Sequence, residues 1–272
     1  MKVWFITGTS RGFGREWTKA ALERGDKVAA TARNTESLDD LVEQYGDNIF
    51  PIGLDVTDHD ADFAAVKSAY EHFGRLDVIV NNAGYGLFGT IEELSEEEAR
   101  AQIETNLFGA LWVTQAALPY LREQKSGHIL QVSSVGGIGA FSGLGLYHAS
   151  KWGLEGFSDA LSKEVAPFGI KVTIIEPGGF TTDWAGSSSK HATPIAAYDG
   201  IRDGRPTRPG GTVKRGDPTA TSTAILKIVD AENPPLRLLL GAFATQLVPE
   251  VYDQRLKVWA EWKDVSVAAD GN

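Results

Sequence analysis

The sequence contains no cysteine among its 272 residues. This absence excludes disulfide bonds, thiolate metal sites and a cysteine nucleophile. Histidine is sparse as well, and no two histidines stand four residues apart, the spacing that often places a metal-binding pair on one helix face. We therefore expect no metal site. The five histidines are His59, His72, His128, His148 and His191.

Long apolar runs and an excess of basic residues are also missing. No apolar run approaches the ~20 residues that a membrane-spanning helix needs. The apolar stretch before Gly8 is too short for a signal peptide, so a cytoplasmic protein is expected. Asp and Glu number 36 against 26 Lys and Arg, which gives a formal net charge of −10. This balance argues against nucleic acid or an anionic membrane as a partner.

Short apolar runs alternate with longer amphipathic stretches over about two-thirds of the chain. The runs at 3–7, 27–31, 49–54, 78–81, 128–132 and 171–175 predict strands, and 236–240 predicts a seventh. Helices are predicted at 14–24, 61–73, 96–122 and 147–165. This alternation predicts a single α/β domain over residues 1–272: a Rossmann fold with a doubly wound, seven-stranded parallel sheet and helices on both faces.

Two later segments differ from this pattern. Residues 185–217 are rich in Gly, Ser, Pro and Arg and show little periodicity. Loops of this length are usually functional or disordered, so we expect either a functional loop or a plain insertion. The tail from Val251, with Trp259 and Trp262, is expected to pack as a C-terminal helix or to contact a partner subunit.

Ser134, Tyr147 and Lys151 form the pattern Ser-x12-Tyr-x3-Lys. Residues four apart share a helix face, so the ammonium of Lys151 is expected beneath the phenol of Tyr147. A nearby positive charge favours phenolate and lowers the tyrosine pKa from its usual value of ~10 toward neutrality. The triplet therefore predicts proton transfer to or from an alcohol oxygen. Taken alone, Tyr-x3-Lys is also common on solvated helix faces.

A glycine-rich turn follows the first predicted strand and opens the first predicted helix. Its spacing is Gly-x3-Gly-x-Gly, with Gly8, Gly12 and Gly14 as the three glycines and Ser10, Arg11 and Phe13 among the residues between them. Such a turn lets a pyrophosphate approach backbone N–H groups at a helix N-terminus. A dinucleotide site is predicted.

The end of the second predicted strand indicates which dinucleotide binds. NAD sites usually place an acidic residue there, which accepts a hydrogen bond from the ribose 2′-hydroxyl. This strand instead ends Ala30-Thr31-Ala32 and continues into Arg33. A guanidinium suits a 2′-phosphate, and Arg11 is a second candidate cation. NADP(H) is therefore predicted over NAD(H).

With these motifs laid out, the chain resembles the short-chain dehydrogenase/reductase family in its short, single-domain subclass, over about residues 1–182. The glycine turn at 7–14 matches the family's Thr-Gly-x3-Gly-x-Gly, and further motifs follow in the family's order. They are Leu54-Asp55-Val56, Asn81-Asn82-Ala83-Gly84, Asn106, the triplet Ser134, Tyr147 and Lys151, and Pro177-Gly178 followed by Thr182.

The resemblance implies a catalytic tetrad of Asn106, Ser134, Tyr147 and Lys151. Ser134 would bind the substrate carbonyl, Tyr147 would donate its proton, and Lys151 would depress the Tyr147 pKa and bind the nicotinamide ribose. Asn106 would hold a water linking Lys151 to solvent. The implied cofactor-binding residues are Gly8, Ser10, Arg11, Gly12, Phe13, Gly14, Arg33, Asp55, Val56, Asn82, Ala83, Gly84, Tyr147, Lys151, Pro177, Gly178, Phe180 and Thr182.

The resemblance also implies an oxidoreductase that interconverts a carbonyl and an alcohol, in a homodimer or homotetramer. Residues 185–217 would be its substrate-binding lid, and Tyr85 and Trp184 are candidates to line an apolar pocket. Epimerases of the extended subclass carry a different glycine spacing, and enoyl reductases usually space Tyr and Lys by six residues. A non-catalytic NADP(H) sensor remains the alternative from another class, although such proteins typically lose the Tyr or the Lys.

Overall fold

The computed structural model describes residues 1–182, 184, 186, 188–203 and 215–271. Seven strands form one sheet in the order β3-β2-β1-β4-β6-β7-β9, and every neighbouring pair is parallel. The predicted doubly wound parallel sheet is confirmed, including its seventh strand. The strands are β1 (Val3–Ile6), β2 (Lys27–Ala32), β3 (Ile49–Gly53), β4 (Val78–Asn81), β6 (Gly127–Val132), β7 (Ile170–Pro177) and β9 (Arg237–Leu240).

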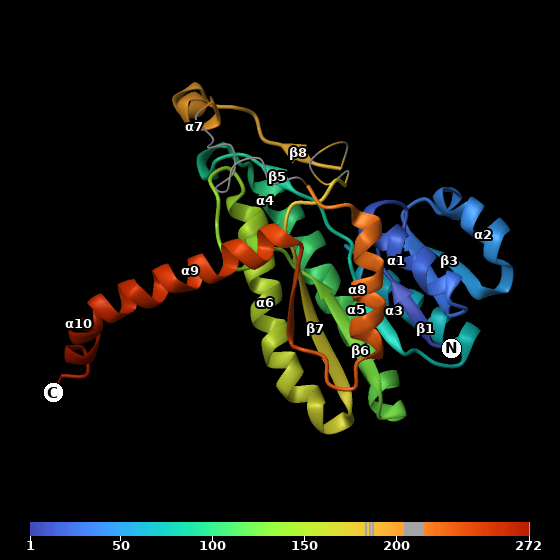
Figure 1. The fold of residues 1–272 in the computed structure, drawn as a ribbon. Coiled ribbons are helices and arrows are strands. Elements are labelled where there is room, and N and C mark those ends of the chain that lie inside the picture. The colour runs from blue at the N-terminus through green and yellow to red at the C-terminus, as the bar shows by residue number, and fades with distance from the viewer. Residues whose placement is uncertain (183, 185, 187, 204–214, 272) are drawn as a thin grey trace.

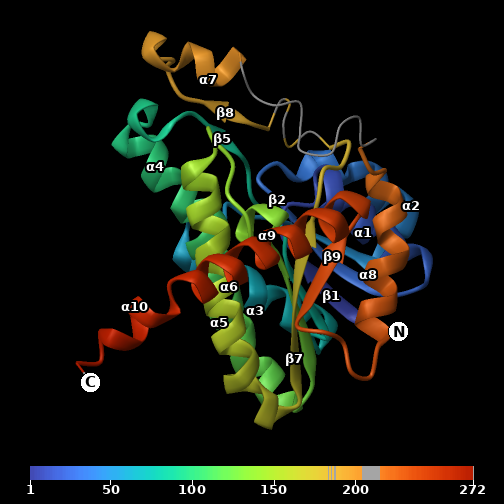
Figure 2. The same ribbon diagram turned by 60° about the vertical axis from the view of Figure 1, so that its left-hand side comes forward.

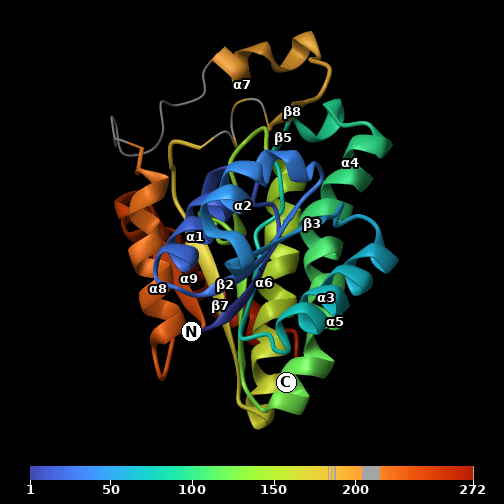
Figure 3. The ribbon, with the colours of Figure 1, turned by 90° about the vertical axis from the view of Figure 1, so that its right-hand side faces the viewer.

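Helices cover both faces of the sheet, as predicted. One apolar core joins α1, α2 and α8 to the strands, and the other joins α3, α5 and α6 to the opposite face. Figure 3 shows α1 and α8 on one side of the strands and α3 and α5 on the other. The helices are α1 (Gly12–Glu23), α2 (Asp39–Tyr45), α3 (His59–Phe73), α4 (Glu96–Ile103), α5 (Gly109–Gln124), α6 (Gly145–Val165) and α8 (Thr221–Asp230).

The helix predicted over 96–122 is present over residues 96–124, but its hydrogen-bonding pattern changes in the middle. α4 ends at Ile103, a π-helical turn spans Glu104–Phe108, and α5 begins at Gly109. The spacing of apolar residues did not reveal the π-helical turn, because such a turn adds only one residue to the helical repeat. Such turns often occur at functional sites. Here the turn carries Asn106, one of the predicted catalytic residues.

Three short elements lie beyond the carboxyl ends of the strands: β5 (Leu87–Phe88), β8 (Lys190–His191) and α7 (Asp199–Asp203). Figures 1 and 2 show them together at this end of the molecule. β5 and β8 pair in parallel. These elements include part of the predicted lid over 185–217, whereas residues 185, 187 and 204–214 of that prediction lie outside the described residues. The lid role stays a prediction.

The tail from Val251 is helical as predicted, as the end of α9 (Ala242–Glu261) and as α10 (Lys263–Ala268), but most of it is exposed and does not pack against the body. Figure 1 shows the far end of α9 and α10 extending away from the sheet. Val248 is buried against the body, while Trp259 and Trp262 are exposed. The alternative, contact with a partner subunit, stays a prediction. No described helix is long and apolar enough to cross a membrane.

Candidate active site

A cavity of about 980 Å³ opens at the carboxyl ends of the strands. Such an edge is where open α/β sheets bind their ligands. Among the individually named candidates, all of which the structure describes, only Gly14 and Asn106 do not line this cavity. The fold therefore gathers segments from residue 8 to residue 182 around one space.

The glycine turn forms one wall of the cavity. Gly8 and Gly12 have φ angles of +69° and +60°, a region that favours glycine. Gly14 lies beneath the turn, where a Cβ would stand 2.3 Å from the Gly8 carbonyl oxygen. α1 begins at Gly12, so the N–H groups of its first turn, which have no acceptor within the helix, lie at the cavity wall. This arrangement fits the pyrophosphate of a dinucleotide.

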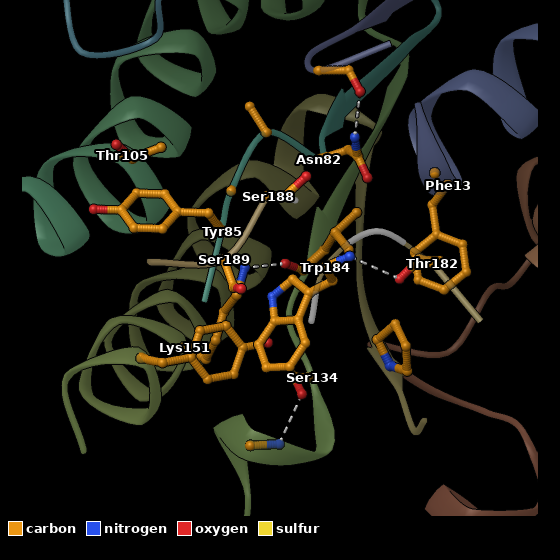
Figure 4. A pocket seen from close by; sticks show the side chains of 18 of the residues that line it. Phe13, Asn82, Tyr85, Thr105, Ser134, Lys151, Thr182, Trp184, Ser188 and Ser189 are labelled. Atoms are coloured by element: carbon orange, nitrogen blue, oxygen red, sulfur yellow. Dashed lines mark hydrogen bonds between the residues drawn. The ribbon is translucent and has the colours of Figure 1, made fainter. Parts of the chain in front are cut away.

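Asn82 ties the turn after β4 to the glycine turn. Its Nδ2 donates to the carbonyl oxygens of Thr7 (2.9 Å) and Gly8 (3.0 Å), and Figure 4 shows it at the edge of the cavity. The Thr7 hydroxyl in turn accepts from the backbone N–H groups of Asn82 (2.9 Å) and Ala83 (3.0 Å). The side chain of Asn82 thus holds the cavity wall in shape.

The far end of the cavity is lined by Arg11, Arg33, Asp55 and Val56. Arg33 directly follows β2 and is exposed. The carboxylate of Asp55 accepts from the backbone N–H (3.1 Å) and the hydroxyl (2.8 Å) of Thr57. The end of β2 therefore presents a guanidinium to the cavity, and the position that would carry an acid for NAD has none.

Ser134, Tyr147 and Lys151 meet at the opposite end of the cavity. Tyr147 and Lys151 lie in the first two turns of α6, and each is only 6% exposed. Lys151 Nζ donates to the carbonyl oxygen of Val132 (2.7 Å), at the end of β6, and lies 6.0 Å from the centre of the Tyr147 ring. Ser134 Oγ accepts from the Gly136 N–H (3.0 Å), which fixes its position.

The pKa values of this pair differ from the expectation that Lys151 lowers the Tyr147 pKa. Burial raises the pKa of Tyr147 to about 12, and the neighbouring Ser134 hydroxyl acts in the opposite direction. Burial also lowers the pKa of Lys151 to about 8, against the negative charge of Glu155. Desolvation dominates, because both groups are shielded from water and Lys151 directs its ammonium to Val132. With these pKa values, Lys151 loses its proton before Tyr147 as the pH rises.

Asn106 lies beside this end of the cavity without lining it. Its Oδ1 accepts from the Tyr85 N–H (3.0 Å), and its Nδ2 donates to the Tyr85 carbonyl (3.0 Å) and to Ser150 Oγ (3.2 Å). A Cβ on Gly84 would stand 3.0 Å from Asn106 Oδ1 and 3.8 Å from Lys151 Nζ. Asn106 therefore fixes the backbone at Tyr85, next to Lys151. The predicted water link stays a prediction.

Aromatic side chains surround the space above Tyr147. The Trp184 ring lies 4.9 Å from the Tyr147 ring and 5.4 Å from that of Phe88, measured between centroids. Figure 4 shows the indole in the middle of the cavity, between Thr182 and the Ser134 and Lys151 side chains. Gly86 makes room for it, because a Cβ there would stand 2.7 Å from Trp184. Phe180 lies farther along, with its ring edge-on to that of Phe13.

Sequence reasoning missed two residues of this region, Phe88 and His148. His148 follows Tyr147 directly in the sequence, and this adjacency was the one signal that could have placed it at the site. Its Nε2 accepts from the Phe141 N–H (2.9 Å), so the proton of the neutral ring is assigned to Nδ1, 3.0 Å from the Gly136 carbonyl oxygen. Burial lowers the pKa of His148. His148 thus fixes the segment 136–141 as a neutral side chain.

Comparisons with known proteins agree with this geometry. The family model described as short chain dehydrogenase matches residues 2–193. An oxidoreductase named BOA17, from Botryotinia fuckeliana, is 43% identical over 98% of this chain and 99% of its own. A short-chain dehydrogenase structure from Streptomyces avermitilis superposes with a TM-score of 0.91 at 40% identity, covering 99% of this chain and 100% of that one.

A third match was solved with a nucleotide bound. It is an alcohol dehydrogenase from the archaeon Thermococcus sibiricus, complexed with 5-hydroxy-NADP. Its TM-score is 0.74 at 28% identity, and the match covers 88% of this chain and 96% of that one. The fold, the gathered motifs and these matches lead to one conclusion: this chain belongs to the short-chain dehydrogenase family of oxidoreductases.

Proposed function

We propose that the protein is an NADP(H)-dependent oxidoreductase that interconverts a carbonyl compound and the corresponding alcohol. The observation that carries this proposal is the placement of Ser134, Tyr147 and Lys151 at one end of a cavity whose other end is the glycine turn and Arg33. The residues present fit a dinucleotide: helix N–H groups for its pyrophosphate, a cation for a 2′-phosphate and an apolar wall. The bound cofactor would supply the hydride.

The protein side chains supply orientation and the proton. Ser134 is placed to donate a hydrogen bond to the substrate oxygen, because its hydroxyl is held by the Gly136 N–H as acceptor. As negative charge grows on that oxygen during reduction, Tyr147 donates its proton to it. Lys151, held by Val132, keeps a positive charge near the phenolate that remains. The reverse reaction uses the same groups in the opposite order.

A non-catalytic NADP(H) sensor would need the same cofactor wall but no proton donor. The burial of both Tyr147 and Lys151 at the cavity favours the enzyme, since burying an amine beside a phenol without a function costs stability. The two proposals differ in one assay. The enzyme consumes NADPH when a panel of ketones and aldehydes is added, whereas the sensor binds NADPH and leaves every carbonyl unchanged.

Selectivity for NADP(H) is expected to depend on Arg33. Replacing Arg33 by Ala removes a charge-assisted contact with the 2′-phosphate, which is typically about 1.5–3 kcal/mol, so NADPH affinity should fall roughly 10- to 100-fold. NADH affinity should change by less than about threefold. Fluorescence titration of both nucleotides measures the effect. Equal binding of NADH and NADPH by the wild-type protein would reject the NADP assignment.

The substrate is expected to be apolar, because Trp184, Phe88 and Tyr85 line the cavity near Tyr147. Replacing Gly86 by Ala places a methyl group where the indole lies, and so displaces Trp184. We expect KM for apolar ketones to rise about tenfold, with NADPH affinity nearly unchanged. Gly156→Ala is the matched control, since its Cβ would meet open space on α6. Steady-state kinetics that show the same KM in both variants would argue against this wall.

A further inference from the structure

Two buried glutamates and one arginine lie next to the catalytic residues. Glu155 stands one helical turn after Lys151 on α6, and Glu176 directly precedes Pro177 on β7. Arg237 Nε, from β9, lies 3.1 Å from Glu155 Oε2 and 3.7 Å from Glu176 Oε1. Glu155 is 7% exposed and Glu176 is 1% exposed. One guanidinium therefore faces two carboxyl groups that are shielded from water.

Several oxygens in this cluster are short of hydrogen-bond donors. Among the described residues, Glu155 Oε1, Glu176 Oε1 and Ser133 Oγ are buried without a hydrogen-bond partner. Gly137 leaves the space that Glu155 occupies beside Ser133, since a Cβ there would stand 2.5 Å from Ser133 Oγ and 3.1 Å from Glu155 Oε1. Two ionised carboxylates in this setting would repel each other, whereas one added proton turns one of them into a donor.

Glu176 is the better site for that proton. Burial, and then the negative charge of Glu155, raise the pKa of Glu176 to about 8. Burial raises the pKa of Glu155 as well, but the neighbouring Ser133 hydroxyl and then the close Arg237 guanidinium oppose this rise. Because Arg237 lies closer to Glu155 than to Glu176, we assign the ionised carboxylate to Glu155 and the neutral acid to Glu176.

Among the described groups around the cluster, Glu155 is the buried carboxylate that stands one helical turn from Lys151. Asp159, on a later turn of α6, is bound by Lys163 and by Arg237, whose Nη2 lies 3.0 Å from Asp159 Oδ2. His148 is neutral, and Asn106 and Ser150 carry no charge. The negative charge of Glu155 raises the pKa of Lys151 and so opposes the effect of burial.

We propose that Glu155 is the buried counter-charge that keeps Lys151 protonated, and that Glu176 stays protonated so that Glu155 carries this charge alone. Glu155 touches neither substrate nor cofactor in this scheme, and it acts through Lys151. The proposal rests on the proposed function only in giving that charge a catalytic purpose. It predicts that Glu155 sets the pH above which the proton-donating state of the enzyme is lost.

The test is to replace Glu155 by Gln and to follow Lys151 by NMR. Protein containing ¹³C-labelled lysine is titrated, and the Lys151 signal is assigned by its loss in Lys151→Arg. Removing a nearby anion disfavours the ammonium, so the Lys151 pKa should fall by about one pH unit or more. The alkaline limb of kcat/KM for reduction should move to lower pH by a similar amount. An unchanged Lys151 pKa in folded E155Q would overturn the proposal.

Two further variants distinguish charge from packing. Glu176→Gln imitates the protonated acid and should leave the Lys151 pKa nearly unchanged at neutral pH; a fall equal to that in E155Q would place the counter-charge on Glu176 and overturn the assignment. Asp159→Asn, which changes a residue at the exposed side of Arg237, should also leave the Lys151 pKa unchanged. If E155Q does not fold, Glu155→Asp takes its place. Moving the charge away by one methylene should lower the Lys151 pKa less, and no fall at all would again overturn the proposal.

The two proposals fail in different ways. If the wild-type protein reduces no carbonyl but Lys151 still titrates lower in E155Q, the proposed function fails and the charge assignment stands. If the enzyme is active and Lys151 titrates identically with and without Glu155, only the charge assignment fails.

Discussion

Replacing Tyr147 by Phe is expected to lower kcat for carbonyl reduction about a thousandfold or more. The variant keeps the ring that packs against Trp184 and loses only the hydroxyl that donates the proton. General acid catalysis by a positioned side chain typically contributes about 10²- to 10⁴-fold. NADPH affinity should change by less than about twofold, because the glycine turn and Arg33 are untouched. Steady-state kinetics together with fluorescence titration separate the two effects.

The matched control for this variant is Tyr120→Phe. Tyr120 stacks on Tyr70, on the face of the sheet covered by α3 and α5, and does not line the cavity. The Tyr120→Phe variant should keep kcat within about twofold of the wild-type value, since it also removes a phenol hydroxyl, but one far from the proton path. A Tyr147→Phe variant with near wild-type turnover would contradict the assigned proton donor.

Replacing Gly14 by Ala is expected to reduce NADPH affinity about a hundredfold. The added Cβ would stand 2.3 Å from the Gly8 carbonyl oxygen and 2.5 Å from Asn82 Nδ2. Both neighbours belong to the wall that receives the pyrophosphate, so the glycine turn and the turn after β4 must separate. Overpacking of this kind costs about 1–3 kcal/mol, which corresponds to roughly 5- to 150-fold in a binding constant.

Thermal unfolding checks whether the effect of Gly14→Ala is local. The melting temperature should fall by a few degrees, while NADPH affinity falls much further than this loss of stability alone would cause. Gly156→Ala serves again as the control, because glycine in an exposed helix interior is replaced by Ala at no steric cost. Unchanged NADPH binding by a folded Gly14→Ala variant would contradict the role given to the glycine turn.

The parallel sheet could be predicted because its strands are short, almost entirely apolar runs separated by helices. Buried strands such as Val3–Ile6 and Val78–Asn81 stand out in any sequence reading. The meeting of Ser134, Tyr147 and Lys151 was also predictable, since the helix spacing of Tyr147 and Lys151 is local and the family motif adds Ser134. The glycine turn could be predicted as a dinucleotide site because it joins the first strand to the first helix.

Features that depend on contacts between distant segments could not be predicted. The π-helical turn carries Asn106, whose hydrogen bonds to Tyr85 and Ser150 join distant segments, and no local pattern encodes either feature. The close contact between Trp184 and Gly86 joins residues that are almost a hundred positions apart in the sequence. The pKa of Tyr147 was predicted in the wrong direction, because the sequence shows the charge of Lys151 but not the burial that outweighs it.

The most direct test of the proposed oxidoreductase function is the transfer of isotope from the cofactor to a carbonyl carbon. NADPH carrying deuterium at both hydrogen positions of nicotinamide C4 is incubated with the wild-type protein and an apolar ketone, and the alcohol is analysed by mass spectrometry and NMR. We expect deuterium on the carbinol carbon of the product, with transfer almost absent in Tyr147→Phe. A protein that binds NADPH through the same cavity but transfers no deuterium to any ketone or aldehyde of the panel would contradict the proposed function.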